Sequence, residues 1–190
     1  MKQIVSLFFF LFLSLAAQAR EIDGVAIPET LSIEGEKAPL VLNGAGLRTR
    51  YTAKIYVAGL YLAKPATAAE AVLESSAPRA VALHLRRDSD SEQIASALIG
   101  SVGKNHSLEE MKPLRDRLNQ FKLMMPDIKK GQIVFLEFPA SGETRVRLNQ
   151  DLRGTLPGAD FQRALLKIWL GAKPVDNDLK RQLLGSPSGG

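Results

Sequence analysis

The alternation of hydrophobic and polar positions predicts several extended segments between residues 27 and 148. The segment 79–87, RAVALHLRR, alternates most regularly, with Val81, Leu83 and Leu85 on one face and Ala82, His84 and Arg86 on the other. Further strands are predicted from β-branched and aromatic residues and from turn signals. They comprise extended pieces within 27–42 that are broken by EGEKAP, a strand over 51–63, and a hairpin of 132–138 and 144–148 around ASGE.

Helical periodicity and capping residues predict a second set of elements. A short helix over 66–75 ends before Pro78, and a helix capped by Ser89 or Ser91 carries Ile94, Leu98 and Val102 along one stripe. The sequence SLEE at Ser107 is a capping box, and Pro113 is expected to kink or restart the helix that follows. Two final helices cover 159–170 and 176–184, with Gly171 and Gly185 as their stops. Because strands and helices both come in runs, the fold class is predicted to be α+β.

The first 19 residues have the pattern of a cleaved export signal. Lys2 provides the charged start, residues 4–15 are apolar, and Ala17-Gln18-Ala19 places small residues at the cleavage positions. The apolar stretch is short for a membrane-spanning helix, which needs about 20 residues. We therefore expect cleavage after Ala19, a single domain over 20–185 and a flexible tail over 186–190, with a retained anchor as the alternative.

The absence of cysteine excludes disulfides, thiolate zinc sites and thiol catalysis. In an exported chain this composition favours the bacterial periplasm. The formal charge of +5 becomes +4 without Lys2 (24 basic minus 20 acidic residues), and the basic residues are scattered. We therefore expect no nucleic-acid partner and at most peripheral contact with anionic lipid headgroups. The sequence leaves the oligomeric state open.

The residue types that usually carry catalysis are sparse. The two histidines, His84 and His106, are each interpreted as solvated surface residues, and no HExxH or G-x-S-x-G motif is present. The sequence NGAG at 43–46 is not followed by a predicted helix, so it does not form a phosphate loop. No metal and no cofactor are expected. Trp169 is predicted to be the largest side chain of the core.

Arg48 stands out because it precedes an apolar strand and follows Asn43, Gly44 and Gly46, which are interpreted as turn formers. Two interpretations are open. The arginine either points to solvent at a hairpin, or places a charge at the mouth of an apolar cleft.

Two segments carry a family resemblance. LNGAGLRTRYTAKIYVAGLYLAK and, far downstream, FQRALLKIWLGAKPVDNDLKRQLLG resemble the exported bacterial branch of the chalcone isomerase-like family, with a match over about 41–185. The resemblance implies an open-faced β-sandwich in which a large antiparallel sheet is covered by a layer of helices. The family's G-x-R arginine falls on Arg48.

The resemblance also bears on activity. True isomerases of this family use the arginine, a threonine on the following strand, and a tyrosine and an asparagine from a cleft helix. Here Tyr56 takes the place of the threonine, and residues 89–103 contain neither Tyr nor Asn; Asn105 lies just beyond. Fatty-acid-binding members keep the arginine and carry a tyrosine on that strand, and the two hold a carboxylate. The resemblance therefore implies a non-catalytic periplasmic binder of a fatty acid or other lipophilic carboxylate, held by Arg48 and Tyr56.

The sequence leaves two alternatives open. One is an intramolecular lyase or isomerase acting on a phenolic or enone substrate, with Arg48 and Tyr56 as catalytic groups. The other is a structural or interaction protein with a closed cleft.

A shared role for Arg48 and Tyr56 has a geometric condition. Eight residues of straight strand would separate them by about 26 Å, so the chain must turn between residues 50 and 53. If Arg48 has a structural role instead, we expect an ion pair with an acid such as Glu137 or Asp151.

Overall fold

The computed structural model describes residues 19–185, so the expected tail and all of the expected signal except Ala19 lie outside the described residues. The strands are β1 Ala19–Ile22, β2 Val25–Pro28, β3 Thr30–Leu31, β4 Leu40–Arg50, β5 Ala53–Leu62, β6 Arg79–Leu85, β7 Ile133–Phe138, β8 Thr144–Leu148 and β9 Asp151–Leu156. The helices are α1 Ala69–Leu73, α2 Ser91–Lys104, α3 Leu108–Met111, the 3₁₀ turn η1 Lys112–Leu114, α4 Arg115–Met124, α5 Ala159–Leu170 and α6 Asn177–Leu183.

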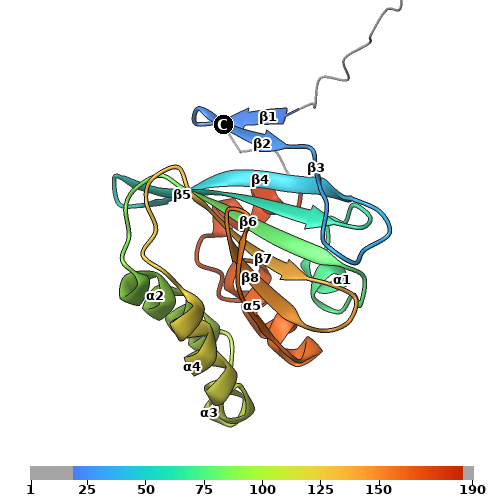
Figure 1. Cartoon of the computed structure of the whole chain (residues 1–190), viewed down its shortest axis with the longest axis vertical. Coiled ribbons are helices and arrows are strands. Elements are labelled where there is room, and N and C mark those ends of the chain that lie inside the picture. Colours follow the sequence, from blue (N-terminus) through green and yellow to red (C-terminus); the bar gives the residue numbers. More distant parts are fainter. Residues whose placement is uncertain (1–18, 186–190) are drawn as a thin grey trace, which may run out of the picture.

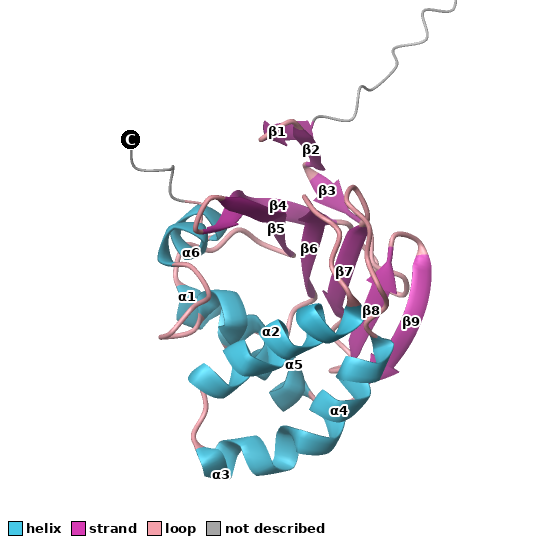
Figure 2. Cartoon of the chain, turned by 90° about the vertical axis from the view of Figure 1, so that its left-hand side faces the viewer, coloured by secondary structure: helices cyan, strands magenta, loops and turns pink. Residues whose placement is uncertain are grey.

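A seven-stranded antiparallel sheet forms the centre of the molecule. Its strands follow chain order from β3 to β9, each paired with the next, while β1 and β2 form a separate two-stranded sheet. The helices gather on one side of the large sheet, and the β1–β2 hairpin lies apart from them (Figures 1 and 2). This arrangement confirms the predicted α+β, open-faced sandwich.

The main core lies between the sheet and α5. Phe161, Leu165 and Trp169 of α5 are at most 1% exposed and pack against inward side chains of β5 to β8. The predicted burial of Trp169 is therefore confirmed.

The opposite face of the sheet carries a second apolar cluster, which the alternation of the strands does not predict. Ile27 and Ile33 cover Val57, Ala80 and Ala82. Asp23, in the β1–β2 turn, holds this hairpin to the sheet through ion pairs with Lys54 and Arg86. Both faces of β6 are consequently buried, so the face that carries Ala82 and His84 is not the solvent face.

Several predicted helix ends are confirmed, but the residue that caps α2 differs from the prediction. Ser107 forms the predicted capping box with Glu110, and Pro113 lies in η1, which separates α3 from α4. The cap of α2 is Asp90, not Ser89 or Ser91, because its carboxylate accepts a hydrogen bond from the Gln93 amide at 2.7 Å. Strand β9 was not predicted, since this edge strand is mostly exposed and lacks apolar alternation.

The interpretation of Asn43, Gly44 and Gly46 as turn formers is wrong. All three lie inside β4, and α6 packs directly on this strand. A Cβ at Gly44 would lie 2.6 Å from the Leu183 carbonyl oxygen and would also overlap the Gln182 carbonyl. A Cβ at Gly46 would overlap the Gln182 side chain. The glycines therefore serve the close approach of a helix.

Within residues 19–185, no helix is both long and apolar enough to cross a membrane.

Candidate functional site

The β4–β5 hairpin brings Arg48 and Tyr56 together. The chain turns at Tyr51 and Thr52, and the register then pairs Arg48 with Tyr56 across the two strands. The guanidinium carbon of Arg48 lies 5.9 Å from the centre of the Tyr56 ring. The sharp turn that a shared role required is thus present.

Arg48 is half-buried and is held by a backbone carbonyl. Its Nη1 donates a hydrogen bond to the Val175 carbonyl oxygen at 2.7 Å. No ion pair of Arg48 occurs among the described residues: Glu137 lies 3.9 Å from Arg147, and Asp151 is an exposed residue of β9. The expected structural ion pair is therefore not observed, and most donors of the guanidinium remain available.

Tyr56 is a buried phenol with a fixed orientation. Its hydroxyl oxygen accepts a hydrogen bond from Trp169 Nε1 at 3.0 Å, and the residue is 8% exposed. Burial raises the pKa of Tyr56 to about 12, although the nearby Arg48 charge acts in the opposite direction. The phenol is therefore protonated at neutral pH and can donate its own hydrogen to a ligand oxygen.

Arg48 and Tyr56 line a cleft of about 590 Å³ between the sheet and α2. Its walls include apolar side chains from both layers, among them Ile55, Leu83, Leu85, Ile94, Leu98, Ile128 and Val134. Arg50 and Arg87 also line it, and no Asp or Glu does. Antiparallel pairing explains the gathering of arginines, because the end of β4, the start of β5 and the end of β6 meet at one edge.

The α2 wall of the cleft carries neither the tyrosine nor the asparagine that the resemblance assigns to true isomerases. The cleft-lining residues of α2 are Gln93, Ile94, Ser96, Ala97, Leu98 and Ser101. The Ser101 hydroxyl donates to the Ala97 carbonyl of its own helix at 2.7 Å. Asn105 follows the end of α2 and turns away from the cleft, since its amide bonds the backbone of Lys173 and Ser101.

Neither histidine lies in this cleft. His106 is half-buried, and its Nδ1 lies 2.8 Å from the Val102 carbonyl oxygen. The interpretation of His84 as a solvated residue is wrong: it is 7% exposed, and its Nε2 finds no hydrogen-bond partner among the described residues. The cause is the β1–β2 hairpin, which buries the second face of β6. Burial lowers the pKa of His84 to about 4.

His84 is expected to make the folded state sensitive to acid. Its folded pKa lies below the value of about 6.5 for an unfolded chain, so the unfolded state binds more protons between these two values. The free energy of unfolding should therefore fall as the pH falls through this window, by about 1 to 2 kcal/mol between pH 7 and pH 5. Denaturant unfolding of the wild type and of His84→Leu at several pH values measures this contribution. A pH dependence that is the same in both proteins would refute it, and His106→Asn serves as the control.

Four contributors to the site were not identified from the sequence: Arg50, Arg87, the Val175 carbonyl and the Trp169 indole. The alternation of the strands could have identified the two arginines. Arg50 has the same strand parity as Arg48, and Arg87 has the parity of Val81, Leu83 and Leu85, so alternation places each on the helix side of the sheet. The contacts from Val175 and Trp169 come from segments more than 100 residues away, and no local pattern predicts them.

Comparisons with known proteins agree with the observed fold. A family model described as chalcone isomerase-like matches residues 19–185. Among solved structures, a crystal structure of a fatty-acid binding protein from Arabidopsis thaliana is similar, with a TM-score of 0.70 and 15% sequence identity. The similarity covers 88% of this chain and 96% of that one. No curated protein matches the sequence.

Proposed function

The chain belongs to the chalcone isomerase-like family, and from this premise we propose that it binds a fatty acid or another lipophilic carboxylate in the cleft between the sheet and α2, without catalysis. The observation that carries the proposal is the pairing of Arg48 with Tyr56 at one end of an apolar cleft.

The polar end of the cleft suits a carboxylate. Arg48 has a planar fork of N–H donors of which one bonds Val175, and the Tyr56 hydroxyl retains a hydrogen to donate. Arg50 and Arg87 add positive charge at the same end; the Asp176 carboxylate acts electrostatically on Tyr56 but does not line the cleft. A charged acceptor that receives donors from both Arg48 and Tyr56 forms the stronger class of hydrogen bond.

The remaining walls suit an acyl chain. The volume of about 590 Å³ lies within the range of about 300 to 1,000 Å³ for small-molecule sites. Burial of each methylene contributes about 0.8 kcal/mol, so a long chain provides roughly 10 kcal/mol before ordering costs. Affinity would come mainly from the chain, and the arginine would select the ligand class and its orientation. The alternative of a structural protein predicts a closed cleft, and a cleft of this volume disfavours it.

The direct test is to identify what the protein carries. Native mass spectrometry of protein purified from its host, followed by lipid extraction, should reveal a bound long-chain acid. Titration of delipidated protein with a fluorescent fatty acid should then give saturable binding with one ligand per chain. Binding that does not saturate, or that a long-chain alcohol competes for as well as the acid does, would contradict a carboxylate site.

The isomerase alternative makes a different prediction. Because the cleft-lining residues of α2 include neither Tyr nor Asn and Tyr56 stands in place of the threonine, the purified protein should not accelerate ring closure of a 2′-hydroxychalcone. The loss of chalcone absorbance over time measures this. A rate well above the spontaneous one, and abolished by Arg48→Ala, would establish the enzyme instead.

We also propose that the protein is exported to a bacterial periplasm after cleavage behind Ala19, on the strength of the N-terminal sequence pattern. Cleavage there removes only the first residue of β1 and keeps the pairing of Arg20 with Ile27. N-terminal sequencing of the periplasmic fraction should start at Arg20. An intact Met1 in the membrane fraction would indicate a retained anchor.

A further inference from the structure

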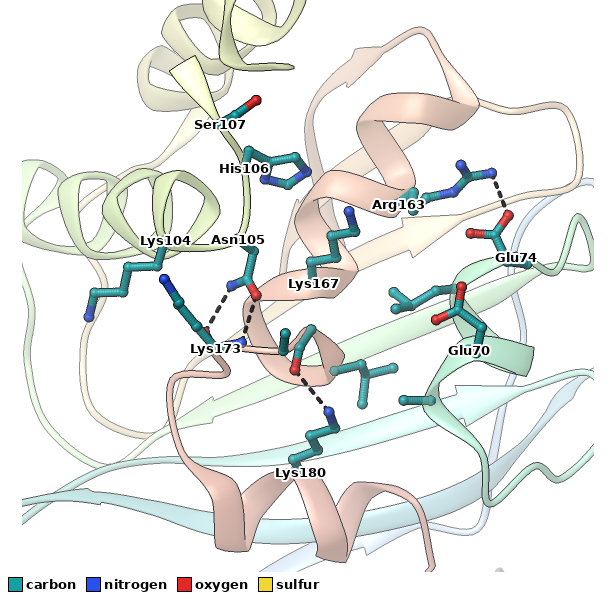
Figure 3. Close-up of a pocket in the computed structure, with 15 residues that line it drawn as sticks. Glu70, Glu74, Lys104, Asn105, His106, Ser107, Arg163, Lys167, Lys173 and Lys180 are labelled. Atoms are coloured by element: carbon teal, nitrogen blue, oxygen red, sulfur yellow. Dashed lines mark hydrogen bonds and ion pairs between the residues drawn. The ribbon is translucent and has the colours of Figure 1, made fainter. Parts of the chain in front are cut away.

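A second cavity, separate from the Arg48 cleft, lies where α1, the end of α2, α5 and α6 meet. It has a volume of about 760 Å³. Its charged lining comprises five cationic side chains, Lys104, Arg163, Lys167, Lys173 and Lys180, and two carboxylates, Glu70 and Glu74. In Figure 3, Lys173, Lys167 and Lys180 lie around Asn105, the Lys104 side chain extends away from it, and the Arg163–Glu74 pair lies at the right.

The lining of this cavity carries more cationic than anionic side chains. Glu74 pairs with Arg163 at 3.0 Å, which leaves Glu70 as the one lining carboxylate without an ion pair among the described residues. Every lysine that forms an ion pair in the described chain lies elsewhere: Lys54, Lys112, Lys122 and Lys129. None of the four lining lysines forms an ion pair in the described chain, although the Glu110 carboxylate lies close enough to interact electrostatically with Lys167.

Helix dipoles explain only part of this concentration. Lys104 and Lys167 lie in the last turns of α2 and α5, where a cation is favourable. Lys173 lies in the loop after α5, and Lys180 comes from a third helix and donates to the Gly171 carbonyl at 2.8 Å. The individual helix dipoles therefore do not explain why four lysines line the same cavity.

Hydrogen bonds join the end of α2 to the loop after α5 at the floor of the cavity. The Asn105 side chain accepts a hydrogen bond from the Lys173 amide at 2.9 Å and donates to the Lys173 carbonyl at 2.8 Å. Gly171 permits this approach, because a Cβ there would overlap the Asn105 side chain and lie 2.6 Å from the Lys167 carbonyl. Fixed backbone under the lysines lowers the ordering cost of binding.

We propose that this cavity binds a phosphate-bearing ligand. Lysine binds phosphate as a compact point charge, so ammonium groups from different elements can each contact a different phosphate oxygen. A phosphate group offers several oxygens and more than one negative charge, so it can accept from ammonium groups on different sides. The volume leaves room for the rest of an organic phosphate. The same chemistry is found in a soluble phosphate ester and in a phospholipid headgroup.

Two probes distinguish these sources. Calorimetric titration with inorganic pyrophosphate tests a soluble anion, and co-sedimentation with phosphatidylglycerol vesicles, against phosphatidylcholine vesicles, tests a lipid headgroup. The expected result is saturable binding of at least one probe that weakens as salt rises. The double variant Lys167→Gln/Lys173→Gln should weaken that binding about tenfold or more. Its fatty-acid titration and thermal melt should match the wild type, which separates this proposal from the function of the Arg48 cleft.

The matched control is Lys64→Gln/Lys130→Gln, which removes the same charge from exposed lysines that line neither cavity and have no ion pair in the described chain. It should leave binding unchanged. Equal weakening by both double variants would show a net-charge effect and overturn the proposal, as would the absence of saturable binding of both probes.

Discussion

Replacement of Arg48 by Ala is expected to weaken binding of a long-chain fatty acid by about 2 to 4 kcal/mol, or roughly 30- to 1,000-fold. The variant leaves a carboxylate in a partly desolvated cleft with the Tyr56 hydroxyl and without the guanidinium beside it. A titration with a fluorescent fatty acid measures the loss. Stability should fall by only about 1 kcal/mol, because the described structure shows one hydrogen bond from this side chain, to Val175.

Companion variants sharpen this result. Arg48→Lys should restore part of the affinity, since it keeps the charge but loses the planar fork. Arg115→Ala removes an exposed arginine of α4 outside the cleft and should bind as the wild type does. If Arg48→Ala melts much earlier and binds fatty acid normally, Arg48 has a structural role and the binding proposal fails.

Tyr56→Phe should affect both binding and folding. The variant removes one hydrogen-bond donor to the ligand. It also removes the acceptor of the buried Trp169 N–H, and leaving that N–H unpaired costs about 1 to 3 kcal/mol of stability. Stability must therefore be measured alongside affinity for this residue.

Gly44→Ala is expected to produce the largest loss of stability, about 3 kcal/mol, with a melting temperature lower by about 6 to 12 °C. The new methyl group would meet the backbone carbonyls of Gln182 and Leu183, and backbone atoms cannot rotate away as a side chain can. Helix α6 must then move from β4, which loosens the buried Leu179 and Leu183. Thermal and denaturant unfolding measure the effect.

Gly100→Ala is the matched control for this substitution. Gly100 lies in α2, and a Cβ there has no heavy atom within 4 Å. The same chemical change should stabilise the protein by up to about 1 kcal/mol, because alanine favours the helix. Equal effects of the two substitutions would contradict the packing role of Gly44.

The sequence by itself determined the elements whose causes are local. The alternation in β6, the capping box at Ser107, the interruption at Pro113 and the two C-terminal helices each depend on residues a few positions apart. The motif around Arg48, together with the C-terminal segment, also identified the family. The turn needed between Arg48 and Tyr56 followed from the length of a straight strand.

Only the tertiary structure decided what surrounds these elements. His84 is buried because a hairpin more than 50 residues earlier covers its face, and Gly44 and Gly46 face a helix that comes about 140 residues later. The carbonyl that holds Arg48 and the indole that holds Tyr56 are similarly distant in the chain. The gathering of lysines around Asn105 joins several helices and a loop. Local periodicity reports which face of an element is apolar, but which partner covers that face depends on contacts between segments far apart in the sequence.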